Sequence, residues 1–144
     1  AFHAMQPIFA AMGKNIVYEG PAGAGQKTKA ANQIAIAGTL AGACEAFAYA
    51  RAAGLDPEKV FSSISGGAAA SFQMSNMIRK ALDGDFAPGF MIKHFVKDMS
   101  IGAETSREYG IDLPVLEQVL REARSLEANG GGTEGTQSLL KYYE

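Results

Sequence analysis

Residues 23–33 read Gly-Ala-Gly-Gln-Lys-Thr-Lys-Ala-Ala-Asn-Gln and open the stretch of sequence that decides the fold. From Gln26 to about Ala53 we predict one alanine-rich helix, roughly 40 Å long at a rise of about 1.5 Å per residue. Its large apolar side chains spread around the whole circumference, and a helix that is apolar on all sides is buried. We therefore predict that this helix runs through the middle of a helical bundle, built by one chain or by two, and that Gly54 ends it.

Shorter helices are predicted to pack around this central helix. Asp56-Pro57 combines an N-cap residue with proline at the first helical position and opens a short helix that reaches about Ser63. Further helices are expected over Phe72–Leu82, Phe90–Tyr109, Pro114 to the glycines at 130–132, and Glu134–Glu144. The predicted fold of residues 23–144 is therefore all-α, a helical bundle around one long central helix.

The first 22 residues have a different character. Ala1–Gly13 carries apolar residues spaced three and four apart, which predicts a helix, and Asn15–Glu19 is short and β-prone, which predicts a strand. Because one strand cannot form a sheet, we interpret residues 1–22 as the tail of a larger domain upstream, followed by a linker.

Composition narrows the classes of function. Hydrophobic content is 47% and charged content 19%, as in a globular domain, and the net charge of −2 argues against a nucleic-acid surface. A single cysteine, Cys44, excludes an intramolecular disulfide and fits the cytosol, and His3 and His94 lack spaced partners for a metal site. The longest nearly uncharged run, Ile34–Ala50, contains Glu45 and is too short for a membrane span.

Three polar residues share one face near the start of the central helix. Residues three and four apart on a helix are neighbours, so Lys29 converges with Asn32 and Gln33. An amine beside an apolar helix body has its charged form disfavoured and can act as a general acid or base, whereas a charged amine can hold an anionic substrate. The two amides can position the amine or hydrogen-bond a substrate hydroxyl. The alternative is a solvated first-turn lysine with two capping amides.

A second candidate pair, Lys97-Asp98, lies within the predicted helix over Phe90–Tyr109. Lys97 falls on a polar stripe, where it either reaches a cofactor or substrate or belongs to an ordinary solvated face. The glycines at 20–25 lack the spacing and the acidic residue of a dinucleotide-binding turn, and the chain contains no P-loop.

Residues 23–33 closely resemble a signature of the β-hydroxyacid dehydrogenase family, which includes 3-hydroxyisobutyrate dehydrogenase and tartronate semialdehyde (2-hydroxy-3-oxopropionate) reductase. Further matches follow in the family's order, at Gly66-Gly67, Asp85-Phe86-Ala-Pro88-Gly89-Phe90, Lys97-Asp98-Met99, Leu113-Pro114 and residues 130–143. The resemblance implies the helical C-terminal domain of such an enzyme, similar to the C-terminal domain of 6-phosphogluconate dehydrogenase. Residues 1–22 would then be the last helix and strand of a Rossmann domain that binds most of the NAD or NADP.

The resemblance also implies roles for individual residues. Lys29 would be the catalytic lysine, which gives a proton to the substrate carbonyl on reduction. Asn32 would bind the substrate, a small hydroxyacid, and Gln33 stands where relatives often have a second asparagine. Lys97 would reach the NAD(P) side of the cleft, and Asp98 would orient or neutralise nearby cations.

Two other interpretations compete with this one. The chain can be a non-catalytic helical oligomerisation module, in which Lys29 is incidental. A relative of 6-phosphogluconate dehydrogenase is disfavoured, because that family usually carries histidine where Asn32 stands. The enzymatic interpretation expects a cytoplasmic homodimer or higher homo-oligomer, no metal, and no dehydrogenase activity from residues 1–144 alone.

Overall fold

The computed structural model describes all 144 residues, and every element that it contains is helical. The elements are α1 (Phe2–Met12), α2 (Ala24–Ala52), α3 (Pro57–Ile64), the π-helix η1 (Gln73–Ile78), α4 (Arg79–Leu82), α5 (Ile92–Glu108), α6 (Pro114–Ala128), and the 3-10 helices η2 (Gly131–Thr133) and η3 (Thr136–Tyr143). The all-α prediction is confirmed, and the main helices begin and end close to the predicted residues.

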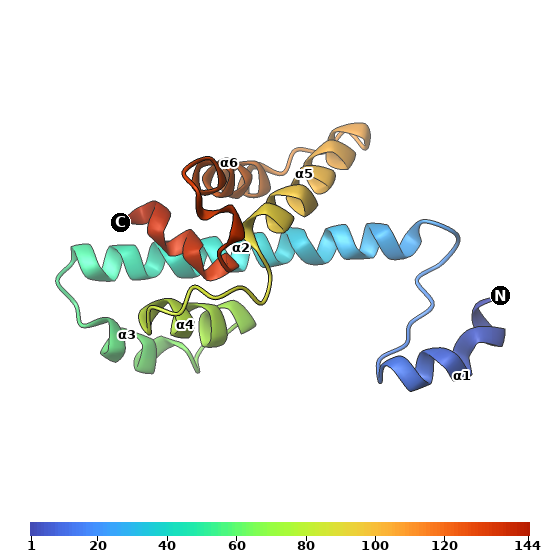
Figure 1. Cartoon of the computed structure of the whole chain (residues 1–144), viewed down its shortest axis with the longest axis horizontal. Coiled ribbons are helices and arrows are strands. Elements are labelled where there is room, and N and C mark those ends of the chain that lie inside the picture. Colours follow the sequence, from blue (N-terminus) through green and yellow to red (C-terminus); the bar gives the residue numbers. More distant parts are fainter.

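Helix α2 spans the molecule, and the other elements of the bundle pack against it (Figure 1). In that view α5 and α6 lie on one side of α2, while α3 and α4 lie on the other. Leu40, Cys44 and Phe47 of α2 are completely buried and belong to one core cluster with α5, α6 and η3. The prediction of a bundle around one long central helix is therefore confirmed.

The ends of α2 follow from two glycines. Gly23 precedes the helix with φ +91° and Gly54 follows it with φ +72°, a left-handed conformation that residues with a Cβ rarely adopt. After Gly54 the backbone N–H of Leu55 donates to the carbonyl of Ala50 at 2.9 Å, which satisfies a carbonyl in the last turn. The predicted end at Gly54 is confirmed.

One expectation about α2 is wrong within this chain, because the helix is not buried on all sides. Ala35, Thr39, Gly42 and Tyr49 are exposed, and their spacing of four, three and seven places them on one face. Tyr49 is 74% exposed. The surrounding helices cover only part of the circumference of α2, so a stripe of three small residues and Tyr49 along it faces outward.

The predicted cap of α3 is also present. A carboxylate oxygen of Asp56 accepts a hydrogen bond from the backbone N–H of Glu58 at 2.9 Å, and Pro57 is the first helical residue. Arg79 then ties α3 to α4, because its guanidinium bonds Glu58 at 2.7 Å and Asp83 at 2.7 Å. The hydrogen bond from Arg79 lowers the pKa of Glu58.

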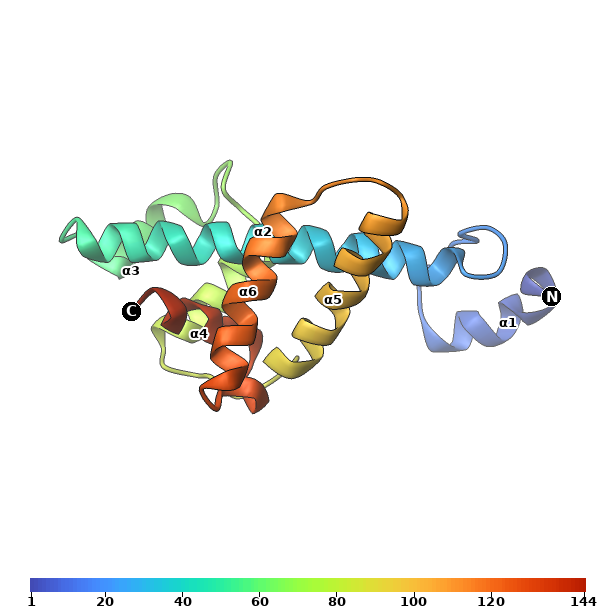
Figure 2. The ribbon, with the colours of Figure 1, turned by 90° about the horizontal axis from the view of Figure 1, so that it is seen from above.

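Residues 1–22 lie apart from the bundle in both views (Figures 1 and 2). Helix α1 forms as predicted but buries none of its residues. The strand predicted over 15–19 is wrong for this chain, in which those residues have no regular structure. A β-prone segment becomes a strand only when a second strand pairs with its backbone, and residues 1–144 offer none beside it.

The C-terminal segment is held against α6 by a buried carboxylate. Glu122 is 2% exposed, and its two oxygens accept hydrogen bonds at 2.8 Å from the Tyr143 hydroxyl and the Gln118 amide.

Burial, with a smaller contribution from the charges of Glu122 and Glu45, raises the pKa of the Cys44 thiol to about 12. Cys44 is therefore an inert core residue.

Among the helices, none combines the length and the apolar character that a membrane crossing requires.

Candidate functional site

The predicted polar residues meet where the first turns of α2 pass the middle of α5. Gln33 is 2% exposed, and its Nε2 donates to Oδ2 of Asp98 on α5 at 2.9 Å. Its Oε1 accepts a hydrogen bond from Nδ2 of Asn32 at 3.1 Å. Gln33 thus joins the two helices, and both ends of its carboxamide are engaged.

The second oxygen of Asp98 extends this arrangement to the surface. Its Oδ1 lies 3.1 Å from Nζ of Lys97, and the side chain of Asp98 is 16% exposed against 68% for Lys97. Asn32, Gln33, Asp98 and Lys97 are thus linked in series by two side-chain hydrogen bonds and one ion pair, and we call this network of side chains the polar chain. It brings together four of the five candidate residues, from two segments 65 residues apart.

Lys29, the fifth candidate, lies beside the polar chain without bonding to it. It lines a cavity of about 190 Å³ between α2 and α5 together with Gln33 and Asp98, which we call the Asp98 cavity. Its Nζ lies 6.0 Å from the centre of the Phe90 ring, near the limit for a cation–π contact, and it forms no ion pair.

The surroundings of Lys29 differ from the expectation in one respect. The side chain is exposed, whereas the sequence placed it beside an apolar helix body. Any further burial of Lys29 must come from groups outside residues 1–144.

Lys29 and Gln33 also line a second cavity, of about 340 Å³, bounded by η1, η3 and the loop before α5. We call it the Gln73 cavity, after a residue of η1 that faces it. Phe90, Gln73, Thr136 and Gln137 in its wall were not among the sequence-based candidates. No local signal marks them, because they come from three segments that only the fold brings to Lys29.

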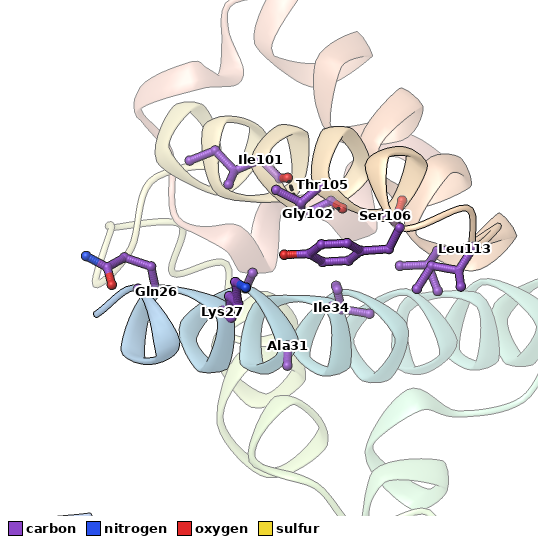
Figure 3. Close-up of a pocket in the computed structure, with 13 residues that line it drawn as sticks. Gln26, Lys27, Ala31, Ile34, Ile101, Gly102, Thr105, Ser106 and Leu113 are labelled. Atoms are coloured by element: carbon purple, nitrogen blue, oxygen red, sulfur yellow. Dashed lines mark hydrogen bonds between the residues drawn. The ribbon is translucent and has the colours of Figure 1, made fainter. Parts of the chain in front are cut away.

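A third cavity, of about 450 Å³, separates the first half of α2 from the second half of α5 (Figure 3). Figure 3 shows Ala31 and Ile34 of α2 on one wall and Ile101 and Gly102 of α5 on the other, with Lys27 at the side. It contains none of the five candidate residues. This mostly apolar cavity therefore lies beside the polar chain and not within it.

Comparisons with known proteins find relatives that match nearly the whole of this chain. Residues 23–143 match the family described as "NAD-binding of NADP-dependent 3-hydroxyisobutyrate dehydrogenase". The chain is 48% identical over 143 residues to an uncharacterized oxidoreductase, YkwC, of Bacillus subtilis, with 99% of this chain and 50% of the relative covered. It is 43% identical to a probable mitochondrial 3-hydroxyisobutyrate dehydrogenase-like protein of Arabidopsis thaliana, with 94% of this chain and 40% of that one covered.

A solved structure shows the same fold. The crystal structure of a 3-hydroxyisobutyrate dehydrogenase from Salmonella typhimurium superposes with a TM-score of 0.90 at 29% identity, with 98% of this chain and 50% of that one covered. The chain spans about half the length, or less, of these relatives.

Proposed function

The chain belongs to the β-hydroxyacid dehydrogenase family of NAD(P)-dependent oxidoreductases, and from this premise we propose that residues 23–144 are the helical substrate-binding and self-association domain of a 3-hydroxyacid dehydrogenase. The reaction interconverts a small β-hydroxy acid with its semialdehyde. The observation that carries the proposal is the convergence of Lys29 with Gln33 and Asp98 on one cavity, because a proton-transfer group needs a fixed polar environment.

In this proposal the Lys29 amine moves the proton. On oxidation it accepts the proton of the substrate C3 hydroxyl, and on reduction it returns that proton to the carbonyl oxygen. Lys29 is suited to the task because no carboxylate of the chain pairs with it. The exposure of its side chain leaves the amine open to a substrate.

The two amides have different tasks. Asn32 gives an amide hydrogen to Gln33, which leaves the Asn32 carbonyl oxygen available for a substrate hydroxyl. The oxygen of Gln33 accepts a hydrogen bond from Asn32, and its amide group donates one to Asp98. We therefore propose that Gln33 acts chiefly by positioning Asn32 beside bound substrate. Asp98 fixes Gln33 in this orientation.

The cofactor is proposed to be NAD or NADP, which when bound supplies the acceptor or donor of the hydride. This chain offers an anionic dinucleotide few binding groups. Lys97 presents one exposed ammonium, and the turn at 20–25 lacks a dinucleotide fingerprint. We propose that Lys97 contacts the cofactor, that Asp98 restrains Lys97, and that residues outside 23–144 provide most of the binding.

The proposal is tested by assaying the full-length gene product with a series of 3-hydroxyacids and either nicotinamide cofactor. We expect formation of reduced nicotinamide, measured by absorbance, together with an aldehyde that a carbonyl reagent traps. A purified chain of residues 1–144 should show neither, since it lacks most of the proposed cofactor site. Absence of turnover with every 3-hydroxyacid would favour the non-catalytic oligomerisation module instead.

We also propose that a second copy of the chain covers the exposed stripe of α2. Ala35, Thr39 and Gly42 in this stripe are small and uncharged, which lets two helices approach closely, while the exposed Glu45 and Tyr49 lie at its C-terminal end. Sedimentation should give a dimer or larger assembly. Gly42→Lys should reduce the mass to that of a monomer, because a Cβ at this position meets no atom within 4 Å and the lysine would project from the stripe.

Gly66→Lys is the matched control for that experiment. A Cβ added at Gly66 would also meet no atom within 4 Å, but this residue lies in the turn after α3, away from the stripe. The control should keep the assembly of the parent protein. A monomeric parent, or equal dissociation by both substitutions, contradicts this assignment of the interface.

A further inference from the structure

The Gln73 cavity contains a buried amide that has no partner in the chain. Gln73 lies at the start of the π-helix η1, is 7% exposed and lines the cavity that Lys29 also lines. Its side chain forms no hydrogen bond within the chain, whereas the two other buried glutamines are bonded. Gln33 bonds Asn32 and Asp98, and the Nε2 of Gln137 donates to two backbone carbonyls at 2.9 and 3.0 Å.

The carboxamide of Gln73 faces the cavity, where hydrogen bonds to water can be exchanged for hydrogen bonds to a ligand. Among side-chain atoms fully removed from solvent only Ser138 Oγ lacks a partner, so the amide of Gln73 stays open to the cavity with its hydrogen-bonding capacity unused by the protein. A ligand group in the cavity that accepts and donates hydrogen bonds would satisfy it. Thr136 in the same wall is nearly as free, because its hydroxyl contacts only the sulfur of Met77, at 3.8 Å.

The remaining wall defines the kind of group that fits. Ile36, Phe72 and Phe90 make part of the lining apolar, which suits a hydrocarbon stem. Lys80 adds a positive charge at the rim, where its Nζ lies 3.4 Å from Asp85 and its side chain is 42% exposed. The volume of about 340 Å³ is far greater than a single methyl group needs.

We propose that the Gln73 cavity holds the substituent at C2 of the substrate, and that Gln73 binds an oxygen at the end of that substituent. The enzyme then prefers 3-hydroxyacids whose C2 substituent carries a hydroxyl or carboxylate over those with an alkyl group of the same shape. This inference rests on the proposed function, because Lys29, which borders the same cavity, fixes the position of C3.

The experiment compares two shape-matched pairs of substrates with the full-length gene product. Glycerate and 3-hydroxyisobutyrate differ by a hydroxyl against a methyl at C2, and 2-(hydroxymethyl)glutarate and 2-(hydroxymethyl)-5-methylhexanoate differ by a carboxylate against an isopropyl at the end of the substituent. We expect kcat/KM to favour the oxygen-bearing member of at least one pair by about tenfold to a hundredfold. Which pair shows the preference identifies the hydroxyl or the carboxylate as the group bound.

Gln73→Met removes the hydrogen-bonding groups at nearly constant shape and should reduce that ratio to within about threefold of one. Gln73→Glu separates the two sources of oxygen, since a carboxylate at position 73 repels a substrate carboxylate and still accepts a bond from a hydroxyl. Gln118→Met, on α6 and outside the lining of the Gln73 cavity, is the matched control and should keep the parent ratio.

The outcomes separate this inference from the function on which it rests. Turnover without a preference in the unmodified protein overturns the inference and leaves the proposed function standing, even if the variants at position 73 fail to fold. A preference that survives in a folded Gln73→Met also overturns it. Absence of turnover with all four acids overturns the proposed function and this inference together.

Discussion

Replacing Lys29 with methionine is expected to lower kcat of the full-length gene product by about a hundredfold to ten thousandfold, the range that a positioned proton-transfer group contributes. Methionine keeps most of the length and the apolar part of the side chain while it removes the amine. Lys29 makes no ion pair in the chain, so the fold should not depend on its charge. Steady-state kinetics with a 3-hydroxyacid and NAD(P), together with the unfolding temperature, measure the two effects separately.

Lys27→Met provides the matched control for Lys29→Met. Lys27 lies two residues earlier on α2, where its Nζ is 5.6 Å from the centre of the Tyr109 ring, in the apolar cavity that contains no candidate residue. Its substitution should leave kcat within about threefold of the parent value. A second variant, Lys29→Arg, keeps the positive charge but cannot donate a proton near neutral pH, so it should be nearly as inactive as Lys29→Met. Full activity in Lys29→Arg would assign the residue to anion binding alone.

The local part of the candidate site could be predicted from the sequence. A spacing of three and four residues on a helix places Lys29 beside Asn32 and Gln33 without knowledge of the fold. The bond between Gln33 and Asp98 could not be predicted in this way, because it joins segments 65 residues apart and depends on how α5 crosses α2. The amide of Gln33 therefore looked like a substrate ligand in the sequence and proves to be engaged with Asp98.

The fold shows the same division between local and distant causes. Asp56-Pro57 and Gly54 determine helix ends through backbone geometry, so these boundaries were predicted correctly. Burial of α2 on all sides was inferred from composition, yet composition does not tell how many neighbours a helix has. The strand expected over 15–19 failed for a related reason, since pairing needs a partner strand that residues 1–144 do not place there.

Replacing Phe47 with alanine is expected to lower the free energy of unfolding of the chain by about 3–5 kcal/mol. Phe47 is completely buried on α2, and its ring centre lies 6.4 Å from that of Phe61 on α3. Truncation removes apolar contacts and leaves a cavity that the helices on both sides of α2 cannot close without moving. Urea unfolding of the parent and the variant measures the difference. The two free energies of unfolding are compared if both proteins show the same dependence of free energy on urea concentration.

Phe72→Ala makes the same chemical change at a position that is 66% exposed, just before η1. It should cost less than about 1 kcal/mol, because most of the ring surface is already in contact with water. The difference between the two phenylalanines tests whether α2 is the centre of the bundle, since only Phe47 lies between α2 and its neighbours. If both substitutions cost the same, Phe47 is not enclosed as described. In that case α3 does not pack against α2 as described, and the central position of α2 in the bundle loses its support.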